Sequence, residues 1–228
     1  MLFQGKELAD VVESDLKQLI DLRRPEDTQL DYKLKLPDNS PRSKVNFLKD
    51  IVALANTAGG VVLYGVEERN GVPEALPGLQ VDSDEEKLRL ANIIRDGTNP
   101  RIDGVRFYAI GLSNSNTILA VEVPRSWKGP HAVNYEGHWR FYGRHSNGNY
   151  PMDVEQVRSA ILGSNQLAEQ IRNFRADRLL KIASGEAPIA LDDRAKLILH
   201  LIPHVAFKPG YGVDLSEYSG FDPYPILL

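Results

Sequence analysis

The chain has 228 residues, of which 42% are hydrophobic and 25% are charged, and its formal net charge is −4. This is enough apolar material for one large or two small domains, which excludes disorder for most of the chain. No apolar run approaches the roughly 18 residues of a membrane helix, and no secretory signal segment is visible. The absence of cysteine excludes disulfides, thiolate zinc sites and cysteine nucleophiles. We therefore expect a cytoplasmic protein with no membrane partner.

The first third of the chain predicts two helices and two strands. Apolar residues recur with the helical period over Lys6–Arg23, and they alternate over Gln29–Leu36, which is typical of a half-buried strand. A second helix is expected from about Ser43 to Ala55, and Gly59-Gly60 ends it. The apolar run Val61–Val66 then predicts a buried strand.

Asn70-Gly71 predicts a turn, and a third helix over Glu85–Arg95 is expected to begin at Ser83, whose spacing to Glu86 is that of a capping box. The remaining expected elements are strands over Val105–Leu112 and Thr117–Val123, a hairpin of His131–Val133 with His138–Tyr142, helices over Asp153–Leu162 and Ala168–Ile182, and a strand over Leu197–Leu201. This order predicts an α/β fold, with a mixed sheet and flanking helices.

Three motifs stand out along the first 71 residues. Glu26 and Asp31 lie five residues apart at the start of a strand, and Tyr32-Lys33 follows them. The second expected helix closes with Ala53-Leu54-Ala55-Asn56-Thr57-Ala58-Gly59-Gly60, and Gly65-Val66-Glu67-Glu68-x-x-Gly71 follows the buried strand. Together these motifs resemble the AlbA-like domain of Schlafen proteins and their bacterial relatives, over about residues 22–165.

The residues themselves indicate two kinds of role. The glycine pair allows the chain to leave a helix through a conformation that a Cβ would hinder, and Asn56 and Thr57 can satisfy backbone groups there. Glu26, Asp31 and Glu68 are carboxylates near strand ends, and such oxygens are preferred by Mg²⁺ and Mn²⁺. These ions can activate water at a phosphodiester, provided that the fold brings Glu68 beside the other two acids. Three solvated surface acids are the alternative.

The resemblance implies a Schlafen AlbA-like domain over residues 6–165, followed over 166–228 by a helical connector and the start of a second unit. Nuclease-active Schlafens, which cut tRNA and related RNA, carry three acids at the positions of Glu26, Asp31 and Glu68. By resemblance these three would be metal ligands and catalytic residues, and Lys33 would steady a phosphate. The family has Glu at the position of Asp31 and Asp at that of Glu68, so each side chain differs in reach by roughly 1.5 Å.

The middle of the chain is basic. Residues 125–181 hold 9 Lys/Arg against 5 Asp/Glu, a net of +4, whereas residues 1–124 hold 15 against 20, a net of −5. Arg140 and Arg144 resemble the basic hairpin of the family, and Arg172 and Arg175 belong to a series with a three-residue period. With the neighbouring aromatic residues Trp127, Tyr135, Trp139 and Tyr142, these arginines could bind phosphates and stack bases. A solvated helix face is the alternative for the Arg172 series.

Two other kinds of site are not expected. His200 and His204 have a helical spacing, but Pro203 between them argues against a regular helix and hence against a zinc site. The sequence has no Gly-x4-Gly-Lys-Ser/Thr motif, so no P-loop for ATP is present.

The leading hypothesis is a nucleic-acid-binding protein with Mg²⁺- or Mn²⁺-dependent endoribonuclease activity on tRNA-like RNA, although DNA is also a candidate ligand. The main alternative is a non-catalytic DNA- or RNA-binding module of a transcriptional regulator or phage-defence protein. A third is an interaction or dimerisation domain. Because only one copy of the motifs is present, a homodimer would complete the two-lobed clamp that the resemblance implies. The three apolar residues at the C-terminus suggest a cut through a larger protein.

Overall fold

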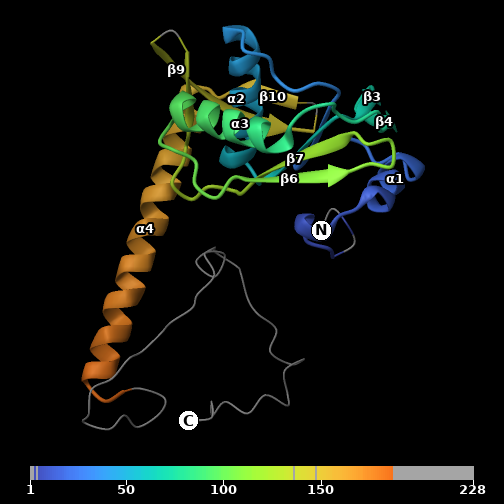
Figure 1. The fold of residues 1–228 in the computed structure, drawn as a ribbon. Helices are drawn as coiled ribbons and strands as arrows, with labels where there is room; N and C mark the ends of the chain where they lie inside the picture. The colour runs from blue at the N-terminus through green and yellow to red at the C-terminus, as the bar shows by residue number, and fades with distance from the viewer. Residues whose placement is uncertain (1–2, 4, 136, 147, 187–228) are drawn as a thin grey trace. The chain divides into compact units, whose positions relative to one another are not determined.

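The computed structural model describes residues 3, 5–135, 137–146 and 148–186 (Figure 1). The expected strand over Leu197–Leu201 and the two histidines at 200 and 204 lie outside these residues. Contacts divide the chain into two units, residues 1–164 and 165–228. None of the helices in the described residues is long and apolar enough to cross a membrane.

Two four-stranded sheets form the framework of the first unit. The first sheet has the order β1 (Leu30–Lys33), β2 (Gly60–Tyr64), β7 (Thr117–Val123), β6 (Arg106–Gly111). Its β1–β2 pair is parallel and its other pairs are antiparallel, which confirms the mixed sheet. The second sheet is antiparallel, with the order β10 (Gly148–Pro151), β9 (His138–His145), β8 (Ala132–Tyr135), β5 (Thr98–Asn99). A separate hairpin consists of β3 (Glu67–Arg69) and β4 (Val72–Ala75).

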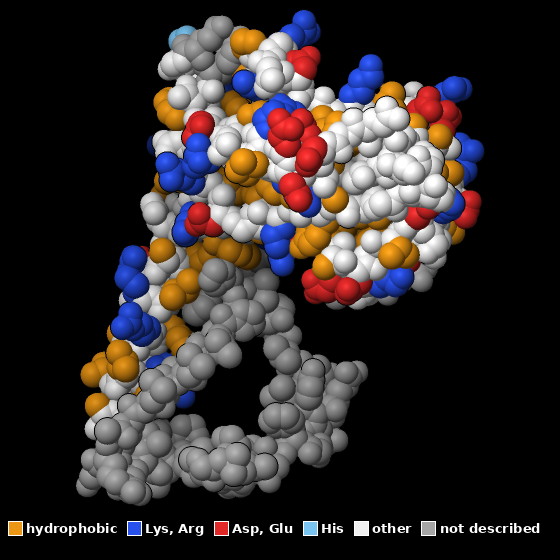
Figure 2. All heavy atoms as spheres, viewed as in Figure 1, with side chains coloured by type: hydrophobic (Ala, Val, Ile, Leu, Met, Phe, Trp, Pro, Cys, Tyr) orange, Lys and Arg blue, Asp and Glu red, His pale blue; other side chains and the backbone are white. Residues whose placement is uncertain are grey.

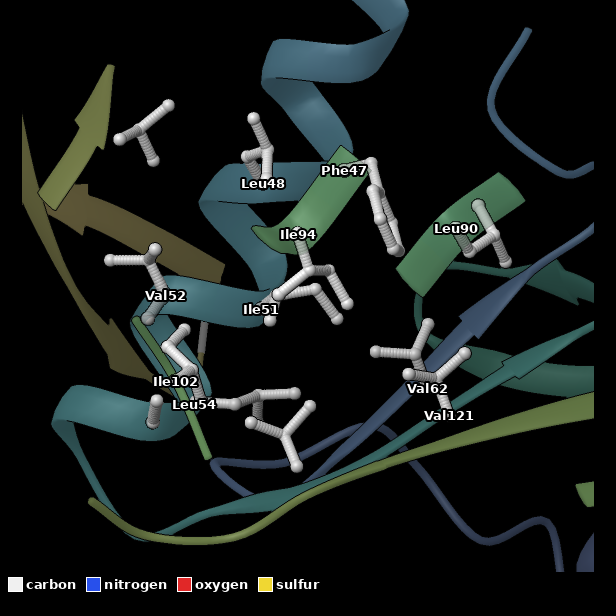
Figure 3. Packing of buried hydrophobic residues seen from close by; sticks show 14 of the residues in the cluster. Phe47, Leu48, Ile51, Val52, Leu54, Val62, Leu90, Ile94, Ile102 and Val121 are labelled. Carbon is white, nitrogen blue, oxygen red and sulfur yellow. The ribbon is translucent and has the colours of Figure 1, made fainter. Parts of the chain in front are cut away.

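The helices are a short 3₁₀ turn η1 (Leu8–Asp10), α1 (Glu13–Asp21), α2 (Pro41–Asn56), α3 (Ser83–Gly97) and α4 (Val154–Ala183). Helix α2 contacts β8, β9 and β10 of the second sheet and also β7 of the first. One core cluster, shown in Figure 3, joins α2 and α3 to the facing side of the first sheet, with residues such as Ile51, Leu90 and Val62. A second cluster packs α1 against the opposite side. The first sheet is therefore buried on both faces, which explains the continuous apolar run of β2.

The glycine pair between α2 and β2 performs the predicted role. Gly59 has a φ of +72° and its amide donates to the carbonyl of Leu54 at 2.8 Å, which closes the end of α2. A Cβ on Gly60 would lie 2.3 Å from the carbonyl oxygen of Gln29, so any side chain there would collide with the backbone leading into β1.

Several predicted boundaries were wrong. The first expected helix is divided into η1 and the shorter α1, and the two helices expected over Asp153–Leu162 and Ala168–Ile182 are one continuous α4. The residue that caps α3 is Asp82 rather than Ser83, because its Oδ1 accepts from the amides of Asp84 and Glu85. Strands β3, β4, β5 and β10 were not predicted, since each has only two to four residues.

Candidate functional site

Strand β1 presents Asp31 and Lys33 toward α2 and the second sheet. Side chains alternate along a strand, and Leu30 and Tyr32 occupy the opposite face, in the core cluster that contains α1. The side chain of Asp31 is 5% exposed, whereas that of Lys33 is 38% exposed and its ammonium forms an ion pair with Asp31 Oδ2. Asp31 is therefore an internal residue of the fold, and Lys33 reaches from it to the surface.

Arg144 on β9 holds the other oxygen of Asp31. The guanidinium is 2% exposed, donates to Asp31 Oδ1 at 2.8 Å and also donates to the carbonyl oxygens of Asp27 and Leu30. The amide of Arg144 donates to Thr57 Oγ1 at 3.1 Å, which ties β9 to the end of α2. Arg144 was expected to contact nucleic acid, but it is placed inside the protein, where it joins the two sheets.

Two residues that the sequence did not single out complete this network. Arg144 Nη1 donates to Asn149 Oδ1 on β10 at 3.3 Å, and Asn149 Nδ2 donates in turn to Asp50 Oδ1 on α2. A signal for Asp50 was present, because it lies among Phe47, Ile51 and Leu54 on the apolar face of the predicted helix. Asn149 ends the basic-hairpin motif that contains Arg140 and Arg144, but no role was predicted for it because β10 itself was not predicted.

Glu26 and Glu68 meet at the turn of the β3–β4 hairpin. The amide of Glu26 donates to the carbonyl of Gly71 at 2.7 Å, and Glu68 Oε2 accepts from the amide of Gly71 at 2.6 Å. Glu26 Oε1 accepts from the amide of Tyr32 on β1 at 2.7 Å, which joins this turn to Asp31. The fold thus brings the three predicted acids into one neighbourhood. We call Glu26, Asp31, Asp50 and Glu68 the acidic cluster.

The acidic cluster holds more negative than positive charge, since Lys33 and Arg144 are the only cations that lie among its four carboxylates in the described part of the chain. Burial, reinforced by Asp31 and Glu68, raises the pKa of Glu26 despite the hydrogen bond from Tyr32. Burial and the Asp31 carboxylate raise the pKa of Asp50 to about 6. Burial works to lower the pKa of Lys33, but Asp50 and Asp31 outweigh it and the pKa is raised. Such mutual perturbation is typical of functional sites, although structural networks also produce it.

The acidic cluster as placed does not fit the expected three-carboxylate metal site. Both oxygens of Asp31 face cations of the protein itself, Arg144 at Oδ1 and Lys33 at Oδ2, although Oδ2 accepts no hydrogen bond among the described residues. Within the described residues, no group of three or more acidic or histidine side chains is arranged to hold a metal. Glu26 and Glu68 each keep one oxygen that no protein donor occupies in the described part of the chain.

The other predicted binding residues are spread over the fold. Arg140 on β9 is exposed, as are Arg172 and Arg175 on α4, and none of the three has an acidic partner among the described residues. Basic and hydrophobic side chains follow one another along α4 in Figure 2, and no residue of this helix is buried. Of the aromatic residues expected to stack bases, Trp139 is 48% exposed, but Tyr142 is only 7% exposed and belongs to the core.

Residues 26–153, more than half of the chain, match the family model described as Schlafen, AlbA_2. The chain belongs to the Schlafen AlbA_2 family. The matched region of this Schlafen AlbA_2 protein contains the whole acidic cluster and all three strands β8, β9 and β10, and it ends just before α4. No curated protein is significantly similar to the chain.

Two solved structures resemble this Schlafen AlbA_2 protein at 19% sequence identity. One is the crystal structure of the DIP2311 protein from Corynebacterium diphtheriae, with a TM-score of 0.39; the match covers 55% of this chain and 25% of that one. The other is the solution structure of the N-terminal domain of a putative ATP-dependent DNA helicase RecG-related protein from Nitrosomonas europaea, with a TM-score of 0.45 and coverage of 63% and 93%. The matched region therefore spans only a quarter of the first relative.

Proposed function

We propose that this Schlafen AlbA_2 domain binds nucleic acid through its basic half. The observation that carries the proposal is the uneven distribution of charge. Residues 125–152 hold four Lys/Arg and only one acidic residue, Glu136. Of these four, Arg144 is paired with Asp31 and Lys128 with Asp103, whereas the exposed Arg140 has no acidic partner in the described residues. An unpaired surface arginine gains favourable energy when it replaces the counterions of a phosphate backbone. On α4, Arg172 and Arg175 are also exposed and have no acidic partner among the described residues.

Fluorescence anisotropy with labelled single-stranded RNA, single-stranded DNA and duplex RNA tests this proposal. Binding is expected to weaken steeply with salt, by a slope of about −0.7 per phosphate contact on a single strand. Arg140→Ala is expected to lower affinity and to reduce that slope by about one contact. Arg95→Ala is the matched control, because Arg95 is 53% exposed and is already paired with Asp96. A chain that binds none of the three probes at low salt would refute the proposal.

A second candidate function is cleavage of a phosphodiester at the acidic cluster. The placement of the acids supports it, because Glu26 and Glu68 both bond the backbone of Gly71 and Glu26 also accepts from the amide of Tyr32, next to Asp31. Burial, with smaller contributions from Asp31 and Glu68, raises the pKa of Glu26. Excess negative charge of this kind attracts divalent cations, which is why Mg²⁺ and Mn²⁺ belong in the test. The RNA preference and the homodimer that the resemblance implies stay predictions.

Incubation of the protein with total tRNA, with Mn²⁺ or Mg²⁺ and with an EDTA control, tests the second candidate. Cleavage that EDTA abolishes, and that the double variant Glu26→Gln/Glu68→Gln lacks while it still binds RNA, would establish nuclease activity at this cluster. A folded protein that shifts RNA but leaves it intact under all these conditions would instead favour a non-catalytic binding module.

A further inference from the structure

The β8–β9–β10 sheet has one face packed on α2 and one face with exposed aromatic residues. Tyr142 and Arg144 of β9 point toward α2 and are buried. The alternate residues Trp139, Phe141, Gly143 and His145 therefore point the other way. Tyr150 of β10 is directly opposite Gly143 in the antiparallel register, so its side chain lies on the same side. We call Trp139, Phe141, His145 and Tyr150 the aromatic face.

The rings of the aromatic face lie close to one another at its β10 end. The His145 and Tyr150 rings are stacked with centroids 4.0 Å apart and an angle of 9° between their planes. Tyr150 also lies across Gly143, where a Cβ would come within 2.6 Å of the tyrosine hydroxyl. The absence of a side chain at position 143 lets the tyrosine ring lie against the sheet. His145 is exposed at this end, and Trp139, toward the other end of β9, is 48% exposed.

Charge favours an anionic occupant at the exposed end of β9. By the alternation along the strand, Arg140 points away from the aromatic face, but it directly follows Trp139, is exposed and has no acidic partner among the described residues. In the sequence, 20 acidic residues precede residue 125, whereas residues 125–152 hold one. Exposed rings and unpaired cations are what proteins use to stack the bases and hold the phosphates of single-stranded nucleic acid.

We infer that the aromatic face is a stacking platform for the unpaired bases of a single-stranded nucleic acid, with Trp139 as its principal contact and with Arg140, on the other face at the same exposed end of β9, for a phosphate of the same strand. This inference rests on the proposed nucleic-acid-binding function and names its substrate class. A duplex keeps its bases stacked on each other and cannot offer them to these rings, so the platform discriminates against duplexes.

The fluorescence of Trp139 gives the most direct test. The chain has two tryptophans, so Trp127→Phe leaves Trp139 as the only reporter. Titration with single-stranded RNA of about 12 nucleotides is expected to quench this fluorescence with the same Kd that anisotropy reports, because a base stacks on the indole. The same RNA annealed to its complement is expected to bind with less quenching.

Substitutions at position 139 separate stacking from general apolar contact. Trp139→Phe keeps an aromatic face and is expected to bind single strands within about twofold of the parent. Trp139→Leu has an apolar side chain without a ring and is expected to bind at least about fivefold more weakly. Leu88→Ala on α3 is the control, because Leu88 is 65% exposed and lies on a helix outside the β8–β9–β10 sheet. Circular dichroism checks that every variant is folded.

The outcomes distinguish failure of the stacking platform from failure of the proposed nucleic-acid binding. Single strands and duplexes that bind equally, with no quenching and no effect of Trp139→Leu, would overturn the platform while nucleic-acid binding stands. No binding of any probe would overturn both. A Trp139 signal that changes with protein concentration alone, without nucleic acid, would assign the face to a second copy of the chain and would also overturn the inference.

Discussion

The acidic cluster and the aromatic face lie on opposite sides of the same strand, β9. Arg144 points inward and is held by Asp31, whereas Trp139 and His145 point outward and are exposed. On the inward side the polar groups are bound by one another, with ion pairs and hydrogen bonds that involve β1, α2, β9 and β10. On the outward side the rings are available to a ligand. Arg140 points to the same side of the strand as Arg144, but it lies at the exposed end of β9. The sequence predicts nucleic-acid binding for both Arg140 and Arg144, but the structure gives the two arginines different surroundings and therefore different roles.

The largest difference is expected in stability. Arg144→Met leaves Asp31 buried beside only Lys33 and leaves the carbonyl oxygens of Asp27 and Leu30 without their donor. Loss of one partner of a buried ion pair lowers the free energy of unfolding by about 3–5 kcal/mol. Arg140→Met, at the exposed end of β9, is expected to change it by less than about 0.5 kcal/mol. Urea denaturation of the two variants measures this, and equal losses would refute the contrast.

Asp50 is expected to give the next largest effect, with the opposite sign. Its folded-state pKa of about 6 lies above the ordinary value of 3.8 for an aspartate, so the folded state holds the proton more tightly than the unfolded state. Stability should therefore fall as pH rises from about 4 to about 6 and stay lower above that range. Asp50→Asn, which can still accept from Asn149, removes this loss and should raise the free energy of unfolding at pH 7 by about 1–2 kcal/mol.

Denaturation at a series of pH values between 4 and 7 measures the Asp50 effect. Asp84→Asn is the control, because Asp84 is 89% exposed and lies in the first turn of α3. If the free energy of unfolding of Asp50→Asn falls with pH as steeply as that of the parent protein, a group other than Asp50 causes the pH dependence.

The smallest effect is expected on binding from the acidic side. Glu68 is exposed, and Glu68→Gln removes one negative charge without touching the aromatic face. Affinity for single-stranded RNA is expected to rise by no more than about twofold at low salt, and the gain should vanish at high salt because exposed charges are screened. A loss of affinity, measured by anisotropy at two salt concentrations, would mean instead that Glu68 contacts the ligand.

Local patterns predicted most of the first sheet and its helices. The apolar run of β2, the glycine pair after α2 and the turn at Asn70-Gly71 all specify structure through neighbouring residues alone. The motifs were enough to name the three acids, but not to predict which groups each acid contacts in the folded protein. Whether Asp31 faces a metal or an arginine depends on the register of β9, 113 residues away, which no local pattern encodes.

The misses have similar physical causes. Gly163 and the polar residues after it suggested a break between two helices, yet α4 continues through them. Strand β10 is short and begins with glycine and asparagine, so its sequence does not predict a strand. The role of Asn149 and the side of the sheet on which Tyr150 lies were therefore not predicted. The direction in which Arg144 points follows from the alternation along β9, but only once α2 is known to cover that side.

One measurement tests the division between the two sides most directly. The double variants Trp139→Ala/Arg140→Ala and Glu26→Gln/Glu68→Gln are compared with the parent protein for binding to single-stranded RNA in EDTA, by anisotropy. We expect the first to bind at least about tenfold more weakly and the second to stay within about twofold of the parent. Binding that is lost in the second variant and retained in the first would contradict the assignment of binding to the aromatic face.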